Sequence, residues 1–226
     1  MQNSVIIVAG GVGKRMGSDV PKQFHLLNGK PVIFHSIQPF IDFDPGIKIV
    51  IVLPKEHIST WQTMCSEFSF HVEHCVVEGG ETRYHSVKNG LSAVSGDGLV
   101  GIHDSVRPNI NSEWVRSCYT EAEKSGNAIP CISITESLRE IENEENKAVD
   151  RNKIKIIQTP QVFLTEIIKL AYTRPYSESF TDDASVIEAA GYKINLVYGL
   201  KENIKITHSA DLHWSEWFKK NPSIFI

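Results

Sequence analysis

Residues 5–24 read Val-Ile-Ile-Val-Ala-Gly-Gly-Val-Gly-Lys-Arg-Met-Gly-Ser-Asp-Val-Pro-Lys-Gln-Phe. The apolar run at positions 5–8 is typical of a buried first strand. Three closely spaced glycines follow this run: Gly10, Gly11 and Gly13. Glycine lets backbone N–H groups face a ligand without interference from a Cβ atom. Three cations surround the same loop: Lys14, Arg15 and Lys22. The stretch therefore predicts a strand followed by a polyphosphate-binding loop.

Two better-known phosphate loops do not match this stretch. A P-loop needs glycine where Val8 stands and Ser or Thr where Arg15 stands. A dinucleotide fingerprint needs its third glycine at Met16 and an acid after the second strand, which ends in Val-Leu-Pro at 52–54. An NAD-dependent oxidoreductase is therefore disfavoured. The alternative interpretation of the loop is a glycine-rich turn with a solvated basic face.

Strand and helix patterns alternate along most of the chain. Strands are expected at 5–8, 47–53, 72–78, 99–103 and 128–134, and helices at 32–40, 57–68, 82–94 and 113–124. This alternation predicts one α/β domain over residues 1–226, with a mainly parallel sheet covered by helices on both faces. Ligands of such sheets bind beyond the carboxyl ends of the strands. The glycine-rich loop, Gly79-Gly80 and Asp104 all fall at that edge.

Residues 135–157 interrupt the alternation. The polar segment 140–147 joins two short candidate strands at 137–141 and 153–158, which predicts a protruding β-hairpin. The alternative is a surface loop without regular structure. Further on, Trp214, Trp217 and Phe218 have helical spacing, so we expect them to pack on the body of the protein.

The overall composition excludes several classes of protein. The net charge of −4 and the pI near 6.1 disfavour a general nucleic-acid binder. No apolar run reaches roughly 18 residues and no charged leader opens the chain, so neither membrane insertion nor secretion is expected. No pair among Cys65, Cys75, Cys118 and Cys131 has Cys-x-x-Cys spacing. We expect reduced, mostly buried cysteines, no zinc and a cytoplasmic location. His71 and His74 favour a polar turn over a metal pair.

The loop pattern Ala-Gly-Gly-x-Gly-x-Arg-Met-Gly, followed by Pro-Lys-Gln-Phe, resembles the signature loop of cytidylyltransferases. Similar matches follow in order at 79–87, 103–108, 149–151, 158–161, 181–185 and 203–207. Together they identify the chain as a member of the 2-C-methyl-D-erythritol 4-phosphate cytidylyltransferase family, of the non-mevalonate isoprenoid pathway. The resemblance implies a Rossmann-like nucleotidyltransferase sheet. It also implies a homodimer in which the hairpin at 135–157 is an arm that embraces the second subunit.

The reaction implied by the resemblance transfers cytidylate from CTP to 2-C-methyl-D-erythritol 4-phosphate and releases pyrophosphate. The nucleophile is already an anionic phosphate oxygen, so no side-chain base is required and electrostatic positioning dominates. The resemblance assigns catalytic roles to Arg15, Lys22 and Lys205. It assigns the nucleotide to Ala9, Gly10, Gly11, Gly13, Gly79, Gly80, Glu81, Arg83 and Ser86. It assigns the acceptor to Asp104, Arg107, Ser137, Arg151 and Thr181, with Ser137 and Arg151 reaching across from the partner's arm.

Asp104 carries a second expectation. A carboxylate at the end of a buried strand is costly unless it is paired or metal-bound. The resemblance implies Mg²⁺, a hard cation that bridges phosphate oxygens and would use Asp104. The alternative is that Asp104 or Ser105 caps a following helix.

Three departures from the family pattern leave the acceptor open. Gly10 stands where many relatives have alanine, Ser105-Val106 replaces two alanines, and Glu136-Ser137 replaces Asp-Thr. Gly10 and Val106 also occur in enzymes that use ribitol 5-phosphate, which is the alternative acceptor. The motifs at 79–87, 149–151 and 181–185 favour methylerythritol phosphate. An inactive nucleotide-binding module is disfavoured because every expected catalytic charge is retained: Arg15, Lys22, Asp104, Arg107 and Lys205.

Overall fold

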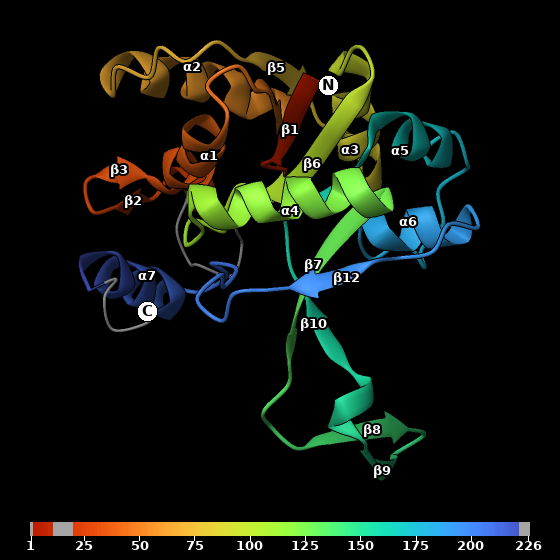
Figure 1. The fold of residues 1–226 in the computed structure, drawn as a ribbon. Coiled ribbons are helices and arrows are strands. Elements are labelled where there is room, and N and C mark those ends of the chain that lie inside the picture. Colours follow the sequence, from red (N-terminus) through yellow and green to blue (C-terminus); the bar gives the residue numbers. More distant parts are fainter. Residues whose placement is uncertain (1, 11–19, 222–226) are drawn as a thin grey trace.

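The computed structural model describes residues 2–10 and 20–221 (Figure 1). Its strands are β1 (Gln2–Val8), β2 (Leu26–Leu27), β3 (Lys30–Pro31), β4 (Lys48–Leu53), β5 (Cys75–Glu78), β6 (Gly98–Asp104), β7 (Asn127–Ser133), β8 (Leu138–Glu142), β9 (Glu145–Val149), β10 (Lys155–Ile157), β11 (Gln161–Leu164) and β12 (Leu196–Tyr198). Its α-helices are α1 (Val32–Phe43), α2 (Ile58–Glu67), α3 (Arg83–Ala93), α4 (Ser112–Ser125), α5 (Thr165–Ala171), α6 (Asp183–Ala189) and α7 (Ser209–Lys220). Short 3-10 turns are η2 (Lys22–Phe24), η3 (Lys55–His57) and η4 (Arg151–Lys153).

The main sheet has the strand order β10-β7-β11-β6-β1-β4-β5, and β12 pairs with β7. The pairs β6–β1, β1–β4 and β4–β5 are parallel, which confirms the predicted fold class. β11 lies antiparallel between β6 and β7. This short strand was not expected, since four residues give too little periodicity to separate a strand from a loop.

Two apolar clusters lie on opposite faces of the sheet. In β1, Val5 and Ile7 pack with α1, α2 and α4, while Ile6 packs with α3, α5 and α6. β4 alternates in the same way, with Ile51 on the first face and Val52 on the second. Because both faces are covered, these strands are continuous apolar runs rather than alternating ones. The predicted helices on both faces are therefore confirmed.

The helix starts depend on short polar side chains. Thr82 caps α3 by accepting from the backbone N of His85, and Asn111 caps α4 by accepting from the backbone N of Trp114 at 2.8 Å. Gly126 ends α4 with φ 82°, a left-handed conformation that suits glycine. A Cβ atom on Gly90 would approach Ile6 Cγ2 to 2.8 Å, so glycine lets α3 pack closely on the sheet.

The predicted hairpin exists, but the predicted position of its second strand was wrong. β8 pairs with β9, and Glu142 faces Glu145, so Asn143 and Glu144 form a two-residue turn. Both have positive φ, 47° and 68°, as a type I′ turn requires. The polar sequence of β9 has low strand propensity and gave no signal. The expected partner at 153–158 contributes β10 instead, which pairs with β7. The hairpin protrudes from the body at the bottom of Figure 1.

Several smaller expectations can be compared with the structure. The expectation that most cysteines are buried was wrong: Cys118 is buried, Cys65 and Cys131 are half-buried, and Cys75 is exposed. Cys75 is the first residue of β5, which is an edge strand of the main sheet. His74 accepts from Trp61 Nε1 at 3.0 Å, and the described residues hold no group of three His, Cys, Asp or Glu side chains suited to a metal.

Helix α7 carries the C-terminal aromatic residues. Trp214 and Phe218 stack with ring centroids 5.3 Å apart, while Trp217 is 46% exposed. Asp211 fixes the start of the helix, accepting from the backbone N of Thr207 and the backbone N of His208, each at 2.8 Å. Across residues 2–10 and 20–221, no helix combines the length and apolar character needed to cross a membrane.

Candidate active site

A cavity of about 280 Å³ lies at the carboxyl edge of β1 and β6. Its lining includes eight of the predicted site residues: Gly10, Lys22, Gly80, Glu81, Arg83, Ser86, Asp104 and Lys205. Cavity volume does not distinguish this site, since one of about 290 Å³ lies at the opposite edge of β4 and β5. This cavity is distinguished instead by the charged side chains that are paired at its wall.

Asp104 ends β6, where it faces Val8 at the end of β1. Its carboxylate is almost buried and faces three cations: Lys205 Nζ at 3.0 Å, Arg107 Nε at 3.2 Å and Arg83 Nε at 3.8 Å. Burial opposes ionisation, but the attraction of these cations outweighs it and holds the pKa of Asp104 well below its usual range. Asp104 is therefore a paired carboxylate. The alternative that it caps a helix is wrong, because the next helix is capped by Asn111.

The Lys205 segment is attached to the Asp104 turn by backbone contacts. Arg107 Nη1 donates to the carbonyl of Asn203 at 2.8 Å, and the backbone N of Ile206 donates to Val106 O at 2.9 Å. Two segments about 100 residues apart are thus held side by side. Arg107 contacts both segments, because its Nε also donates to the carboxylate of Asp104.

A buried hydrogen-bond chain orients Asp104 from behind. The backbone N of Asp104 donates to Thr159 Oγ1 at 3.0 Å, and Thr159 Oγ1 lies 3.1 Å from His103 Nδ1. His103 Nε2 lies 3.2 Å from the carbonyl of Arg107, which can only accept. The network therefore assigns the proton to Nε2 and makes Nδ1 the acceptor for the Thr159 hydroxyl. Burial lowers the pKa of His103 to about 4, so the imidazole is neutral at pH 7.

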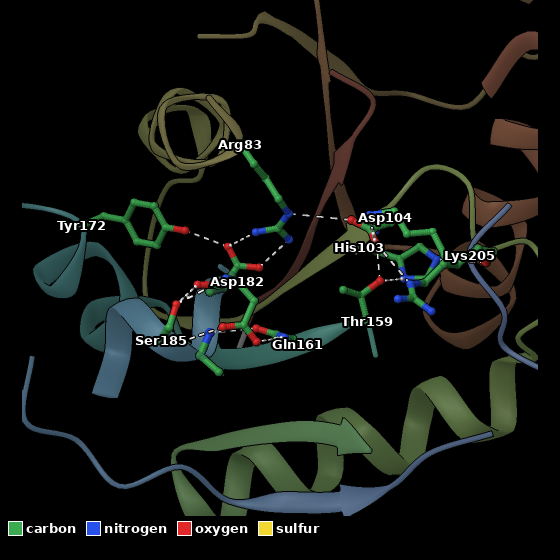
Figure 2. A network of polar contacts seen from close by, with 12 residues as sticks. Arg83, His103, Asp104, Thr159, Gln161, Tyr172, Asp182, Ser185 and Lys205 are labelled. Carbon is green, nitrogen blue, oxygen red and sulfur yellow. Dashed lines mark hydrogen bonds and ion pairs between the residues drawn. The ribbon is translucent and has the colours of Figure 1, made fainter. Parts of the chain in front are cut away.

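Arg83 forms a second ion pair, with a buried aspartate behind the cavity. Nη1 and Nη2 donate to the two oxygens of Asp183 at 2.9 and 2.6 Å (Figure 2). Tyr172 donates to the same carboxylate at 2.7 Å. Burial disfavours the charged guanidinium, but Asp183 and then Asp104 outweigh it and raise the pKa of Arg83.

The glycines at 79–80 pack tightly against the start of α3. The backbone N of Gly79 donates to Leu53 O at 2.8 Å, and the backbone N of Gly80 donates to Ser86 Oγ at 3.1 Å. A Cβ atom on Gly80 would lie 2.4 Å from the Cβ of His85, so glycine is required sterically. Both amides are satisfied within the chain, so any base contact here would use other groups.

The first strand is fixed by a residue that sequence reasoning missed. The buried Gln23 donates through Nε2 to the carbonyl of Ala9 at 2.9 Å. The backbone N of Ala9 donates to Val52 O. These bonds place Lys22, beside Gln23, on the cavity wall.

Comparisons with known proteins agree along nearly the whole chain. A profile described as 2-C-methyl-D-erythritol 4-phosphate cytidylyltransferase matches residues 3–220. The chain belongs to this family. The prediction made from the sequence motifs is thereby confirmed.

Curated and solved members of the family resemble the chain closely. The enzyme of that name from Bacteroides thetaiotaomicron is 50% identical over 212 residues, covering 94% of this chain and 97% of its own. The one from Phocaeicola vulgatus is 46% identical over 216 residues, covering 96% and 99%. The crystal structure of the Francisella tularensis 2-C-methyl-D-erythritol 4-phosphate cytidylyltransferase is 29% identical, with a TM-score of 0.80 and coverage of 96% and 99%.

Not all residues assigned from the cytidylyltransferase resemblance meet in this cavity. Ser137 precedes β8 and Arg151 lies in η4, both at the protruding hairpin, where Arg151 donates to the carbonyl of Thr135. Thr181 lines a separate cavity of about 560 Å³ together with Ile157 and Leu196. Gly11, Gly13 and Arg15 lie outside the described residues.

Four residues behind the cavity hold its lining or each other in place, and none had a role assigned from the sequence. They are His103, Thr159, Tyr172 and Asp183. His103, Thr159 and Asp183 lie inside the motifs at 103–108, 158–161 and 181–185, so the motifs were the available signal. Tyr172 lies outside these motifs, and nothing local distinguishes it from a core position.

Proposed function

We propose that the chain transfers the cytidylyl group of CTP to 2-C-methyl-D-erythritol 4-phosphate, releasing pyrophosphate. Its membership of a cytidylyltransferase family supports a nucleotidyltransferase activity. The observation that carries the proposal is Asp104, held by three cations at the edge where the glycine segments meet. An acidic group surrounded by excess positive charge suits two phosphate-bearing substrates.

The chemistry needs no proton transfer by a side chain. An anionic oxygen of the acceptor phosphate forms a bond to the α-phosphorus of CTP. The bond from that phosphorus to the bridging oxygen breaks, and pyrophosphate leaves with the electron pair. The barrier is dominated by bringing two anions together and stabilising charge on the phosphoryl oxygens. Lys22 and Lys205 on the cavity wall are the described cations assigned to this task, with Arg15 as the third.

The carboxylate of Asp104 suits the acceptor side. A polyol hydroxyl donates readily to an ionised carboxylate, and charge-assisted hydrogen bonds of this kind are strong. Arg107 and Lys205 keep Asp104 ionised and in place. We assign Asp104 and Arg107 to positioning the polyol phosphate.

Mg²⁺ is the cofactor implied by the resemblance, and Asp104 is the residue that would hold it. Both oxygens of Asp104 already face cations, and the described residues gather no multidentate metal cluster. Mg²⁺ commonly binds through one or two carboxylates plus substrate phosphates. The donor set therefore fits Mg²⁺ only when a triphosphate supplies the other ligands, and the bound ion would neutralise phosphate charge. Calorimetry should detect Mg²⁺ binding only with CTP present; tight binding to the protein alone would contradict this.

A homodimer with exchanged arms accounts for the placement of Ser137 and Arg151. The hairpin is polar and protrudes from the body of the chain (Figure 1), and no residue of β8 or β9 lines the cavity. Near its base, β12 exposes Leu196 (50%) and Tyr198 (79%), apolar surface that a second copy would cover. We propose that Arg151 of each chain reaches the acceptor phosphate in the other, and that the enzyme acts in the cytoplasm.

The acceptor is tested by mixing CTP and Mg²⁺ with each candidate polyol phosphate and measuring pyrophosphate. Turnover with methylerythritol phosphate supports the proposal. Turnover only with ribitol 5-phosphate would replace it, and CTP binding without any turnover would favour an inactive nucleotide-binding module.

Subunit exchange tests the arms. Arg151→Ala and Lys22→Ala chains, each nearly inactive alone, are mixed under exchange conditions. If Arg151 acts in trans, the heterodimer contains one site with neither defect, and activity returns. If it acts in cis, every site keeps a defect. A monomer at working concentration, or an exchanged mixture without activity, excludes the shared site.

A further inference from the structure

Two consecutive aspartates at the start of α6 have different partners. Asp182 caps the helix, accepting from the backbone N of Ser185 at 2.9 Å, and it also accepts from Gln161 Nε2 at 2.8 Å. Gln161 Oε1 in turn accepts from the backbone N of Ala184. Asp182 therefore completes the helix terminus. Asp183 has different partners, since its carboxylate accepts from Arg83 and Tyr172.

Asp183 is fully buried, with 0% of its surface exposed. A carboxylate in that position persists only if its charge is matched. Arg83 supplies a two-point pair and Tyr172 a hydroxyl, so both carboxylate oxygens are engaged. Such fork-to-fork pairs fix orientation as well as charge. The plane of the guanidinium is therefore set by Asp183.

The third nitrogen of the same guanidinium faces the active site. Arg83 Nε lies 3.8 Å from Asp104 Oδ1, a charge contact longer than a hydrogen bond. The result is a carboxylate–guanidinium–carboxylate bridge from α6, through the first residue of α3, to the end of β6. Arg83 also lines the cavity. The bridge thus joins the segment assigned to the nucleotide with the residue assigned to the acceptor.

We propose that Asp183 is a positioning residue for the transfer reaction, acting through Arg83, an inference that rests on the proposed function. By occupying both terminal nitrogens, Asp183 prevents Arg83 from forming its own two-point pair with Asp104. Asp104 Oδ1 then stays available to the acceptor polyol, while Oδ2 remains with Lys205 and Arg107. Without Asp183, the released guanidinium would turn to the nearest carboxylate, which is Asp104.

The test varies the bridge one member at a time. Asp183→Asn keeps the shape but removes the charge that holds Arg83. We expect the KM for the polyol phosphate to rise, or kcat to fall, by roughly 10- to 100-fold, the range that follows from a misplaced positioning group. The Kd for CTP, measured by calorimetry, should change by less than about threefold. Asp183→Asn together with Arg83→Gln should be no worse than Arg83→Gln alone, because Asp183 acts through Arg83.

Tyr172→Phe is the matched control. It removes one hydrogen bond from the same buried carboxylate but leaves the Arg83 pair intact. We expect lower thermal stability with an unchanged acceptor KM. Equal kinetic effects in Tyr172→Phe and Asp183→Asn would show a merely structural role and overturn the proposal, as would defects that multiply in the double variant.

Two further measurements cover the cases in which Asp183→Asn does not fold or the wild type shows no turnover. If Asp183→Asn does not fold, Arg83→Lys replaces it, since lysine keeps the charge but cannot bridge both carboxylates; a native acceptor KM there overturns the proposal. Wild-type turnover is measured first, and its absence would refute the proposed function itself. Binding of the polyol phosphate by calorimetry needs no turnover, so it reports the Asp183 effect separately.

Discussion

Replacing Lys205 by alanine separates the stability of the site from its chemistry. Lys205 Nζ lies 3.0 Å from Asp104 Oδ2, but 41% of the lysine side chain is exposed. Asp104 also keeps Arg83 and Arg107 after the substitution. A partly exposed ion pair is worth about 0.2–1 kcal/mol because solvent screens it. For a chain of this size that corresponds to a fall in Tm of no more than roughly 4 °C.

The kinetic loss should be far larger. Charge on the α-phosphoryl oxygens grows along the reaction path, and a preorganised cation aimed at it stabilises the transition state more than the bound CTP. Losing one such contact costs about 3–4 kcal/mol, or roughly 10²–10³ in kcat. The same change should weaken CTP binding much less, since the ground-state phosphates keep their other cations.

The assay follows pyrophosphate release at saturating CTP and acceptor, with CTP affinity measured by calorimetry and Tm by thermal unfolding. Lys201→Ala is the control, because Lys201 is exposed in the same segment but does not line the cavity. We expect Lys205→Ala to lose turnover and Lys201→Ala to keep it. Near-native kcat in a folded Lys205→Ala protein would refute the assignment of Lys205 to the phosphoryl centre.

Three other outcomes are expected. Lys22→Ala should lower kcat by roughly 10²–10³ with a smaller change in CTP affinity, measured in the same assays; equal losses in both would assign Lys22 to ground-state binding. Hydrogen bonds from neighbouring groups outweigh burial and lower the pKa of Asp211, so its stabilising effect is present above about pH 4 and disappears as the carboxyl is protonated. In urea unfolding, Asp211→Asn should therefore have a lower free energy of unfolding than the wild type at pH 7, and this difference should shrink towards pH 3. A difference that does not change with pH would contradict this. Gly80→Ala forces a Cβ to 2.4 Å from that of His85 and should cost about 1–3 kcal/mol, while Gly46→Ala, with its nearest contact at 3.4 Å, should cost little.

Local sequence patterns predicted the strands whose own apolar composition favours a strand. The apolar runs that become β1, β4 and β6 are buried on both faces, and their composition alone favours a strand. The pairing of β8 with β9 escaped prediction because it depends on two residues with positive φ, Asn143 and Glu144, rather than on apolar periodicity.

The residues of the candidate site also divide into those that local sequence indicates and those that it does not. Lys22, Asp104 and Lys205 were found because each stands in a recognisable motif, and the structure places all three on one cavity. The motif at 181–185 includes Asp183 but does not show that this residue pairs with Arg83. Asp183 is 100 residues away along the chain, and its neighbour Asp182 has the more familiar task of capping a helix. Only the packed arrangement shows which of the two carboxylates meets the guanidinium.

The antiparallel insertion of β11 has a consequence for biosynthesis. Thr159 reaches the site because it precedes β11, and the partners of Asp104 and Arg83 at positions 183 and 205 come later still. During synthesis, the first half of the chain emerges and begins to fold before these residues exist. A chain that ends before residue 159 therefore contains Asp104 and the segments assigned to the nucleotide without the groups that contact them in the folded protein. The site can be completed only after residue 205 has been synthesised and has packed beside Asp104.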